Sequence, residues 1–215
     1  MEIGQIQVYL NSSDIQERLK ALTELRNYDS EIAIPLLRTR QQDSEFVIRS
    51  FVAMGLGNKR SPESFKILLE MIKNDPDYNV RAEATNSLSK FGEKSIPHLV
   101  EKFREDDNWL VRRSIIAALT DMPYPEALYE VCICALVGED LTVQETAINA
   151  LGTLAGTSKE TDALQQILAF VNAESWMLRL QTARALKRFD DPQAKAALNY
   201  LSKDQDHRVV AAVNN

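Results

Sequence analysis

The sequence predicts an all-α protein, an α-solenoid of about six stacked helical hairpins with a half-unit cap at each end. Three observations lead to this class. A nine-residue segment recurs at nearly constant spacing, its apolar residues follow a helical period, and no stretch alternates as a strand does. We therefore expect repeats that are each too small to bury their own apolar face and that share a core with their neighbours.

The repeat is visible in six segments that each end in leucine. Counted from the first residue of each segment, which we call the anchor, successive segments begin 31, 32, 31, 32 and 35 residues apart, and a truncated seventh follows 31 residues later. The segments are ERLKALTEL (17–25), IRSFVAMGL (48–56), VRAEATNSL (80–88), VRRSIIAAL (111–119), VQETAINAL (143–151), LRLQTARAL (178–186) and VVAAV (209–213). Apolar residues cluster at the anchor and four, five and eight positions later, which predicts one buried helix face.

A second apolar-periodic run follows each segment and predicts the second helix of a hairpin. The runs are IPLLRT, FKILLEMI, IPHLVEKF, ALYEVCICAL, LQQILAFV and AKAALNYL. Ser61 and Asp191 each precede a proline at the start of such a run, as a capping residue does before a proline at the first helical position. Pro35, Pro97 and Pro125 are also expected near helix beginnings, where a missing amide hydrogen costs least.

The whole chain, 1–215, is predicted to form a single domain. Its units lie near residues 14–43, 44–75, 76–106, 107–138, 139–173 and 174–204, with partial caps at 1–13 and 205–215. We expect GQIQVYL to supply the second helix of an incomplete first unit and VVAAVNN to form the half-unit at the other end.

Charge and composition exclude several classes of protein. The formal net charge is −6 and basic residues form no block, which argues against nucleic acid as a partner. The longest apolar run, Val131 to Val137, is far shorter than the roughly 20 residues of a membrane span, so no membrane insertion is expected. The start, MEIGQIQ, carries an acid where an export signal carries bases, and we expect a cytoplasmic protein.

Arginine follows the anchor in five of the six complete segments, and aspartate stands five residues before four anchors. The residues are Arg18, Arg49, Arg81, Arg112 and Arg179, with Asp43, Asp75, Asp106 and Asp204. We interpret them as a ladder of salt bridges and carbonyl caps between adjacent units, interrupted by Gln144. Anion binding by the arginines is the alternative. The aspartates either cap a helix or close the preceding turn.

Aromatic residues stand two positions before four anchors, at Phe46, Tyr78, Trp109 and Trp176. Hydrophobic staples at the helix starts are the favoured interpretation. The alternative is a row of exposed anchors on one edge, because tryptophan is frequent at the energetic centre of interfaces.

Cysteine and histidine do not suggest a metal site. Cys132 and Cys134 are two residues apart, so a helix points them in opposite directions and they cannot share an ion. Cys134 aligns with apolar core positions of other units, whereas Cys132 is the candidate for partial exposure; a buried structural cysteine is the favoured interpretation. His98 and His207 are far apart in sequence. No catalytic, cofactor or metal motif is present.

Candidate partner-binding residues come from two places. The fifth unit is longer than the others and acidic, and it contributes Glu139, Asp140, Glu160 and Asp162, which are expected to steer a basic patch of the partner. The second helices are expected to line one long surface. Their outward positions contribute Arg38, Lys66, Glu70, His98, Glu101, Lys102 and Gln165, to which we add Trp109 and Trp176.

The third segment shows the pattern D-x-D-x-x-V-R-x-x-A-x-x-x-L in full, through Asp75, Asp77, Val80, Arg81, Ala84 and Leu88. This pattern and its short period resemble the HEAT-like repeats of the phycobilisome lyase family, over essentially the whole chain. The chain is most similar to small cyanobacterial members of that family. The resemblance implies an α-solenoid and one of three roles: bilin lyase subunit, phycobilisome-breakdown protein or adaptor.

Our first hypothesis is a non-catalytic scaffold, adaptor or assembly factor that binds protein partners of cyanobacterial photosynthetic or phycobilisome complexes. Under it no cofactor is expected. The alternative implied by the resemblance is a bilin lyase or phycobilisome-degradation subunit that holds a linear tetrapyrrole. A further alternative is a helper in iron–sulfur or photosystem assembly that uses Cys132.

Overall fold

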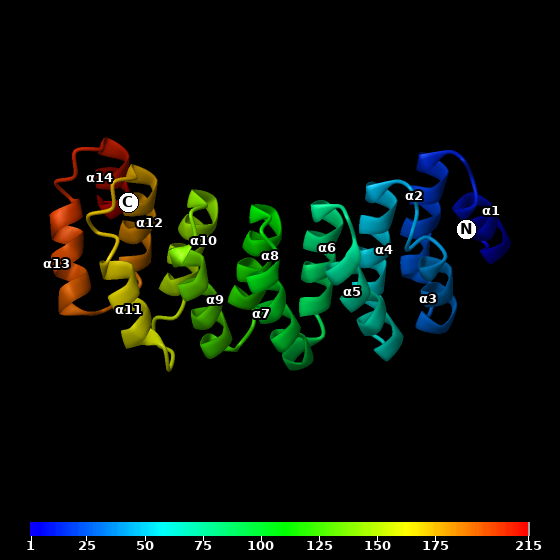
Figure 1. The fold of residues 1–215 in the computed structure, drawn as a ribbon, viewed down its shortest axis with the longest axis horizontal. Coiled ribbons are helices and arrows are strands. Elements are labelled where there is room, and N and C mark those ends of the chain that lie inside the picture. Colours follow the sequence, from blue (N-terminus) through cyan, green and yellow to red (C-terminus); the bar gives the residue numbers. More distant parts are fainter. Residues whose placement is uncertain (215) are drawn as a thin grey trace. The chain divides into compact units, whose positions relative to one another are not determined.

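A computed structural model describes residues 1–214, and over that range all of the regular secondary structure is helical (Figure 1). The predicted all-α solenoid class is confirmed, because helices alternate as the two members of successive hairpins. We call the first members A helices: α2 (Ile15–Glu24), α4 (Phe46–Lys59), α6 (Tyr78–Ser89), α8 (Trp109–Thr120), α10 (Leu141–Gly152), α12 (Trp176–Leu186) and α14 (His207–Asn214). The second members are B helices: α1 (Ile3–Leu10), α3 (Ser30–Arg38), α5 (Pro62–Asn74), α7 (Ile96–Glu105), α9 (Pro125–Val137), α11 (Glu160–Leu168) and α13 (Pro192–Leu201).

The chain divides into two compact units whose boundary falls within α8, between Ile115 and Ile116. In unit 1, α4 packs against both α2 and α6, and α5 packs against both α3 and α7. In unit 2, α12 packs against both α10 and α14, and α11 packs against α13. Each unit is thus a stack of hairpins in which A helices meet A helices and B helices meet B helices.

The core of each repeat is the face that the anchor spacing predicts. In α4 the anchor Ile48 and the residues four, five and eight positions later, Val52, Ala53 and Leu56, are all fully buried. B helices complete this core from the other side, since α5 packs on its own A helix and on the next one, α6. A hairpin therefore buries its apolar face only with the help of its neighbour, as expected of a repeat protein.

Neighbouring A helices are in close contact at two glycines that lie nine residues after the anchor. A Cβ atom on Gly57 of α4 would lie 2.6 Å from Ser87 Cβ of α6, and one on Gly152 of α10 would lie 3.0 Å from the Cα atom of Ala185 in α12. Small residues on both sides are thus what allows these helices to touch backbone to backbone.

The four ladder aspartates close turns rather than cap helices. Asp75 Oδ1 accepts a hydrogen bond from the backbone N–H of Asp77, and Asp204 accepts in the same way from Asp206. The caps stand two residues further on: the side chain of Asp77 accepts from the N–H of Asn79 at the start of α6. Of the two roles that the sequence left open, the structure therefore selects the turn.

One helix start differs from the expectation. The helix around Pro35 begins at Ser30, so Pro35 lies inside α3 and not near its beginning. Pro62, Pro125 and Pro192 are first residues of their helices, as predicted, and Pro97 is the second residue of α7. No helix within residues 1–214 has the length and apolarity that a membrane crossing requires.

Candidate interaction surfaces

Four of the five ladder arginines reach an aspartate of the following repeat. Arg49 donates from Nε to Asp75 Oδ2 at 2.7 Å and from Nη2 to Oδ1 at 2.9 Å. The other pairs are Arg18–Asp43, Arg81–Asp106 and Arg179–Asp204. The arginine Nη1 atoms donate to backbone carbonyls just before their own helices, as Arg49 does to those of Asp43 and Ser44. Each arginine therefore ties its own helix start to the turn that enters the next A helix.

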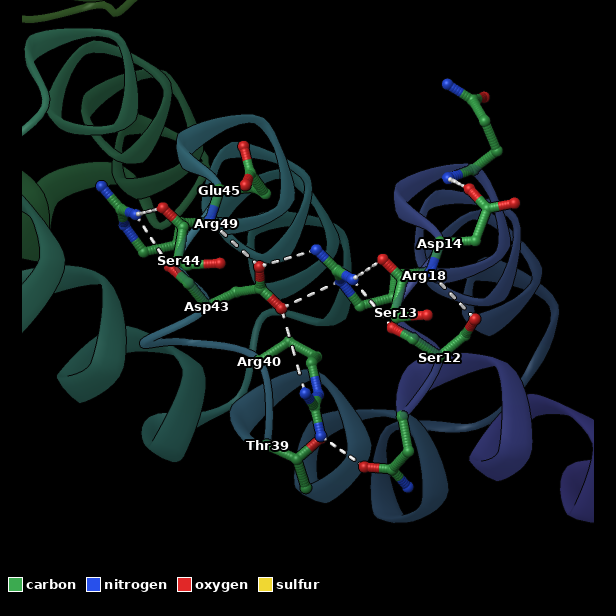
Figure 2. A network of polar contacts seen from close by, with 12 residues as sticks. Ser12, Ser13, Asp14, Arg18, Thr39, Arg40, Asp43, Ser44, Glu45 and Arg49 are labelled. Atoms are coloured by element: carbon green, nitrogen blue, oxygen red, sulfur yellow. Dashed lines mark hydrogen bonds and ion pairs between the residues drawn. The ribbon is translucent and has the colours of Figure 1, made fainter.

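Figure 2 shows the first of these pairs with its surroundings. Asp43 Oδ1 accepts a hydrogen bond from Arg18 Nη2 at 3.2 Å, and Oδ2 lies 3.1 Å from Arg18 Nε and 3.9 Å from Nη1 of Arg40. Its Oδ1 atom in addition accepts from the backbone N–H of Glu45. One buried carboxylate thus joins an arginine of α2, an arginine that follows α3 and the turn before α4.

The ladder is interrupted at the fifth segment, just before it and at its second position. Position 138, where the pattern calls for aspartate, carries glycine, and Arg112 instead donates to the backbone oxygen of Asp106 at 2.7 Å. Its guanidinium lies over the ring of Phe103, 5.5 Å from the centroid. Gln144 takes the arginine position in the next segment and donates to the carbonyl of Gly138 at 2.7 Å. Carbonyl capping is therefore retained where the charge pair with the following repeat is lost.

The pairs shift the acidity of their members. The hydrogen bond with Asp75 raises the pKa of Arg49, and the hydrogen bond from Arg179 lowers the pKa of Asp204. Burial alone would raise the pKa of Asp106, but hydrogen bonds from Arg81, the N–H of Asn108 and Lys102 outweigh it and lower that pKa. The charged forms are thus favoured in the folded state.

Open recesses lie beside three of these pairs, between the C-terminal ends of neighbouring B helices. The recess beside Arg81 and Asp106 has a volume of about 590 Å³, and those beside Arg49 and Arg179 have volumes of about 390 and 490 Å³. Their walls combine carboxylates with basic side chains, such as Lys73 and Glu105 at the first of them.

The aromatic residues before the anchors are the first residues of their helices. Phe46, Tyr78 and Trp109 begin α4, α6 and α8, and their exposed fractions are 45%, 44% and 42%. A hydrophobic staple uses the residue before the cap and hides it, so the favoured staple interpretation does not fit these three. They form a repeated exposed feature of unit 1, which we call the aromatic row.

Trp176 occupies the same position in unit 2 but is half-buried. The guanidinium carbon of Arg208 lies 3.2 Å from the centroid of its ring, so arginine and indole are stacked.

Most of the candidates on the B helices are exposed. These are Arg38, Lys66, Glu70, Glu101 and Gln165, whereas His98 is half-buried with its ring 5.8 Å from that of Phe65. Lys102 was expected to point outward, and this is wrong. It is buried, with Nζ 3.1 Å from Asp106 Oδ2, because it lies one helical turn before the aspartate that Arg81 also binds.

The acidic residues of the fifth unit are partly engaged in local structure. Asp140 accepts from the N–H of Val143 and caps α10. Asp162 pairs with Lys159 at 3.0 Å, and Glu160 is the first residue of α11. Glu139 is exposed. These carboxylates are distributed over two helix starts, where negative charge also interacts favourably with the helix dipole.

The favoured interpretation of a buried structural cysteine holds for Cys132, but Cys134, which was aligned with core positions, is exposed. Cys132 is fully buried and burial raises the pKa of its thiol, whereas Cys134 is exposed. The register assigned to α9 was therefore wrong by one residue, which corresponds to a rotation of about 100° on a helix. The thiol that the assembly-helper alternative needs at Cys132 lies inside the core.

A basic groove of unit 2 was missed in the sequence. It lies between α12 and α14, has a volume of about 700 Å³, and includes Arg184, Lys187, Arg188 and Arg208 among its lining residues. The signal was present as basic residues three and four positions apart at the end of α12, which share one helix face. No group of three or more His, Cys, Asp or Glu side chains within residues 1–214 is arranged to hold a metal ion.

Two relatives with known names match part of the chain. Deoxyhypusine hydroxylase of Drosophila melanogaster is 27% identical over 127 residues, which is 57% of this chain and 42% of that protein. The protein of the same name from Drosophila pseudoobscura pseudoobscura is 26% identical over 108 residues, which is 49% of this chain and 36% of that protein. The chain thus spans only about two-fifths of the length of these relatives.

Solved structures with the same fold extend over nearly the whole chain. YibA of Escherichia coli superimposes with a TM-score of 0.69 at 19% identity, over 99% of this chain and 80% of that one. The complex of CpcE and CpcF of phycocyanin lyase from Nostoc sp. PCC7120 gives a TM-score of 0.56 at 17% identity, over 100% of this chain and 93% of that one. The family model of HEAT repeats matches residues 5–89, 39–120 and 96–170. The chain therefore belongs to the family of HEAT-repeat proteins.

Proposed function

We propose that this protein is a non-catalytic scaffold that binds a protein partner along the aromatic row of unit 1. The observation that carries the proposal is the repetition of an exposed aromatic side chain at the first position of α4, α6 and α8. A large aromatic residue that serves only the repeat has no need to leave nearly half of its surface in water. Aromatic residues are enriched where interfaces gain most of their energy.

The row has the dimensions of a docking site for an extended or helical segment. Neighbouring packed helices lie about 8–10 Å apart, and a partner helix rises about 10 Å in seven residues. Apolar residues seven apart on the partner would therefore meet successive rings. Burying the exposed part of each ring is worth on the order of 2 kcal/mol, so the three rings together supply a substantial part of a micromolar affinity.

In finer terms, we propose an adaptor or assembly factor that works in the cytoplasm on photosynthetic or phycobilisome complexes. The support is the resemblance of the repeat at Asp75, Val80, Arg81 and Leu88 to repeats of the phycobilisome lyase type. The remaining candidates, on the B helices and in the acidic fifth unit, would then belong to the polar rim around the aromatic anchors.

The test is affinity capture from a cyanobacterial lysate with the intact chain and with the triple variant Phe46→Ser, Tyr78→Ser, Trp109→Ser. Captured proteins are compared by quantitative mass spectrometry. The matched control is Ile32→Ser, Val137→Ser, Tyr200→Ser, which removes three exposed apolar side chains from B helices. We expect a partner whose capture falls about tenfold in the row variant alone. Equal capture by the row variant would reject the aromatic row as the docking site.

The second candidate is a bilin lyase or phycobilisome-degradation subunit. It is favoured by the recesses beside the Arg–Asp pairs, in which carboxylates and basic side chains lie together as the pyrrole nitrogens and propionates of a linear tetrapyrrole require. The test is incubation of the purified protein with phycocyanobilin. A shift of the visible absorbance that is lost in Lys73→Glu would support this candidate, and an unchanged spectrum would reject it.

A further inference from the structure

We propose that the groove between α12 and α14 of unit 2 binds an acidic segment of a protein partner that also carries apolar residues. The proposal rests on the scaffold function and adds to it the chemistry of a second binding site. Within unit 2 this groove lies on the A-helix side and involves none of the residues of the aromatic row.

The charge of the groove is the first argument. Arg184, Lys187 and Arg188 are exposed at the end of α12, and His207 and Arg208 are exposed on α14. All five belong to the lining of the groove, and that lining contains no carboxylate. Asp206 lies just outside it and neutralises one of the cations. In a chain with a formal charge of −6, a local excess of basic side chains selects an acidic ligand.

Part of the lining of the groove is apolar. Trp176, Leu180, Ala211 and Ala212 belong to it together with the basic side chains. A ligand with carboxylates alone would leave this surface in water, so the geometry favours a segment whose acidic residues alternate with apolar ones. The small residues on α14 allow the ligand to approach the helix closely.

Two of the arginines are already held in place. Arg208 stacks on Trp176 while Asp206 binds its Nε at 3.0 Å and its Nη2 at 2.7 Å. Arg188 donates to the backbone oxygen and to Oδ1 of Asn149 on α10, at 3.4 and 3.3 Å. A cation that is oriented before binding loses less conformational entropy when a carboxylate arrives.

A protein segment fits the surroundings better than a nucleic acid does. Glu139, Asp140, Glu145, Glu160, Asp162 and Glu174 belong to the same unit. A continuous phosphate backbone carries charge well beyond a groove of this size and would be repelled by these carboxylates, whereas a short acidic segment places its charge only where the basic residues lie.

The experiment is a peptide selection with a matched negative target. A phage library of random peptides of about twelve residues is selected on the intact protein after depletion on Arg184→Glu, Arg188→Glu. We expect peptides with several Asp or Glu residues next to apolar ones.

A synthetic copy of the best peptide should bind the variant at least about tenfold more weakly, and its affinity for the intact protein should fall as the salt concentration rises. Lys94→Glu, Arg113→Glu, the same charge change at two exposed residues of unit 1, should bind it unchanged. Circular dichroism checks that both variants are folded.

Three outcomes would overturn the proposal. Selected peptides without acidic enrichment, or peptides that bind the variant equally well, would show that the groove does not choose carboxylates. An oligothymidine that displaces the peptide and binds more tightly would assign the groove to nucleic acid. Self-association that disappears in Arg184→Glu, Arg188→Glu would assign it to a second copy of the chain. Each of these results leaves partner capture through Phe46, Tyr78 and Trp109 untouched, so failure here and failure of the scaffold function are distinguishable.

Discussion

Arg49 of α4 and Asp75, which follows α5, are joined by two hydrogen bonds of 2.7 and 2.9 Å, one to each carboxylate oxygen. The pair links consecutive repeats and is largely buried, with exposed side-chain fractions of 11% and 5%. Removing one member leaves the other charge without its counter-ion inside the protein. We therefore predict that Asp75→Ala lowers the free energy of unfolding by about 3 kcal/mol, measured by urea denaturation.

The control for this prediction is an exposed pair of the same chemistry. Arg38 and Glu63 also connect neighbouring hairpins, at 3.2 Å, but their side chains are 63% and 49% exposed. Glu63→Ala should change the free energy of unfolding by less than about 1 kcal/mol. Similar losses in the two variants would show that burial does not make the ladder important.

The ladder also predicts how stability depends on pH. The pKa values of Asp106 and Asp204 are lowered in the folded state, so the unfolded chain binds protons at these groups more readily. Their contribution is complete above the unfolded pKa of about 4 and is lost as the pH falls through the folded pKa. Denaturant midpoints measured between about pH 7 and pH 3 should therefore decrease.

The loss should be smaller when a pair is already absent. Asp204→Asn and Arg179→Gln each remove the Arg179–Asp204 pair. The denaturant midpoint of each variant should therefore be lower than that of the intact protein at neutral pH and close to it at acid pH. Parallel curves for the intact protein and both variants would contradict the assignment of the pH dependence to this pair.

The fold was predictable because its signal is repeated. The anchor spacing identifies the buried face of the A helices from α4 to α12, since the same four positions must meet the same neighbours in each repeat. The buried face of the B helix α9 was assigned incorrectly, because the uninterrupted apolar run from Val131 to Val137 is compatible with several faces. Cys134 was aligned with core positions for that reason, although it is exposed. Periodicity assigns a face only when polar residues mark the opposite one.

The surfaces were less predictable because they depend on more than one helix. Lys102 looks exposed on its own helix, and only the cross-repeat pair of Arg81 with Asp106 explains why it is buried. The basic groove has a similar cause, because its charges come from α12 and α14 and are hidden in a chain whose net charge is negative. A pattern within one segment cannot show which side chains two helices bring together.

The close approach of A helices leads to a prediction about glycine. Replacing glycine by alanine inside a helix normally stabilises it by up to about 1 kcal/mol. At Gly57 the new Cβ would lie 2.6 Å from Ser87 Cβ and 2.9 Å from Ser87 Cα, so α4 and α6 must separate. We expect Gly57→Ala to lower the free energy of unfolding by about 1–3 kcal/mol, measured by urea denaturation.

Gly4 of α1 provides the matched control, because no atom lies within 4 Å of the position its Cβ would take. Gly4→Ala should leave the stability unchanged or raise it. Equal stabilisation by both substitutions would show that the contact between Gly57 and Ser87 is not tight.

The cysteines give the most direct check on the register of α9. Cys134 is exposed, whereas Cys132 is fully buried and its burial raises the pKa of the thiol. Since the thiolate is the reacting species, a maleimide should label Cys134 in the native protein and reach Cys132 only after denaturation. Intact-mass spectrometry counts the labels, and Cys134→Ser should abolish native labelling while Cys132→Ser leaves it unchanged. Native labelling at Cys132 would place the helix in the other register, with the face that now packs against α10 turned toward solvent.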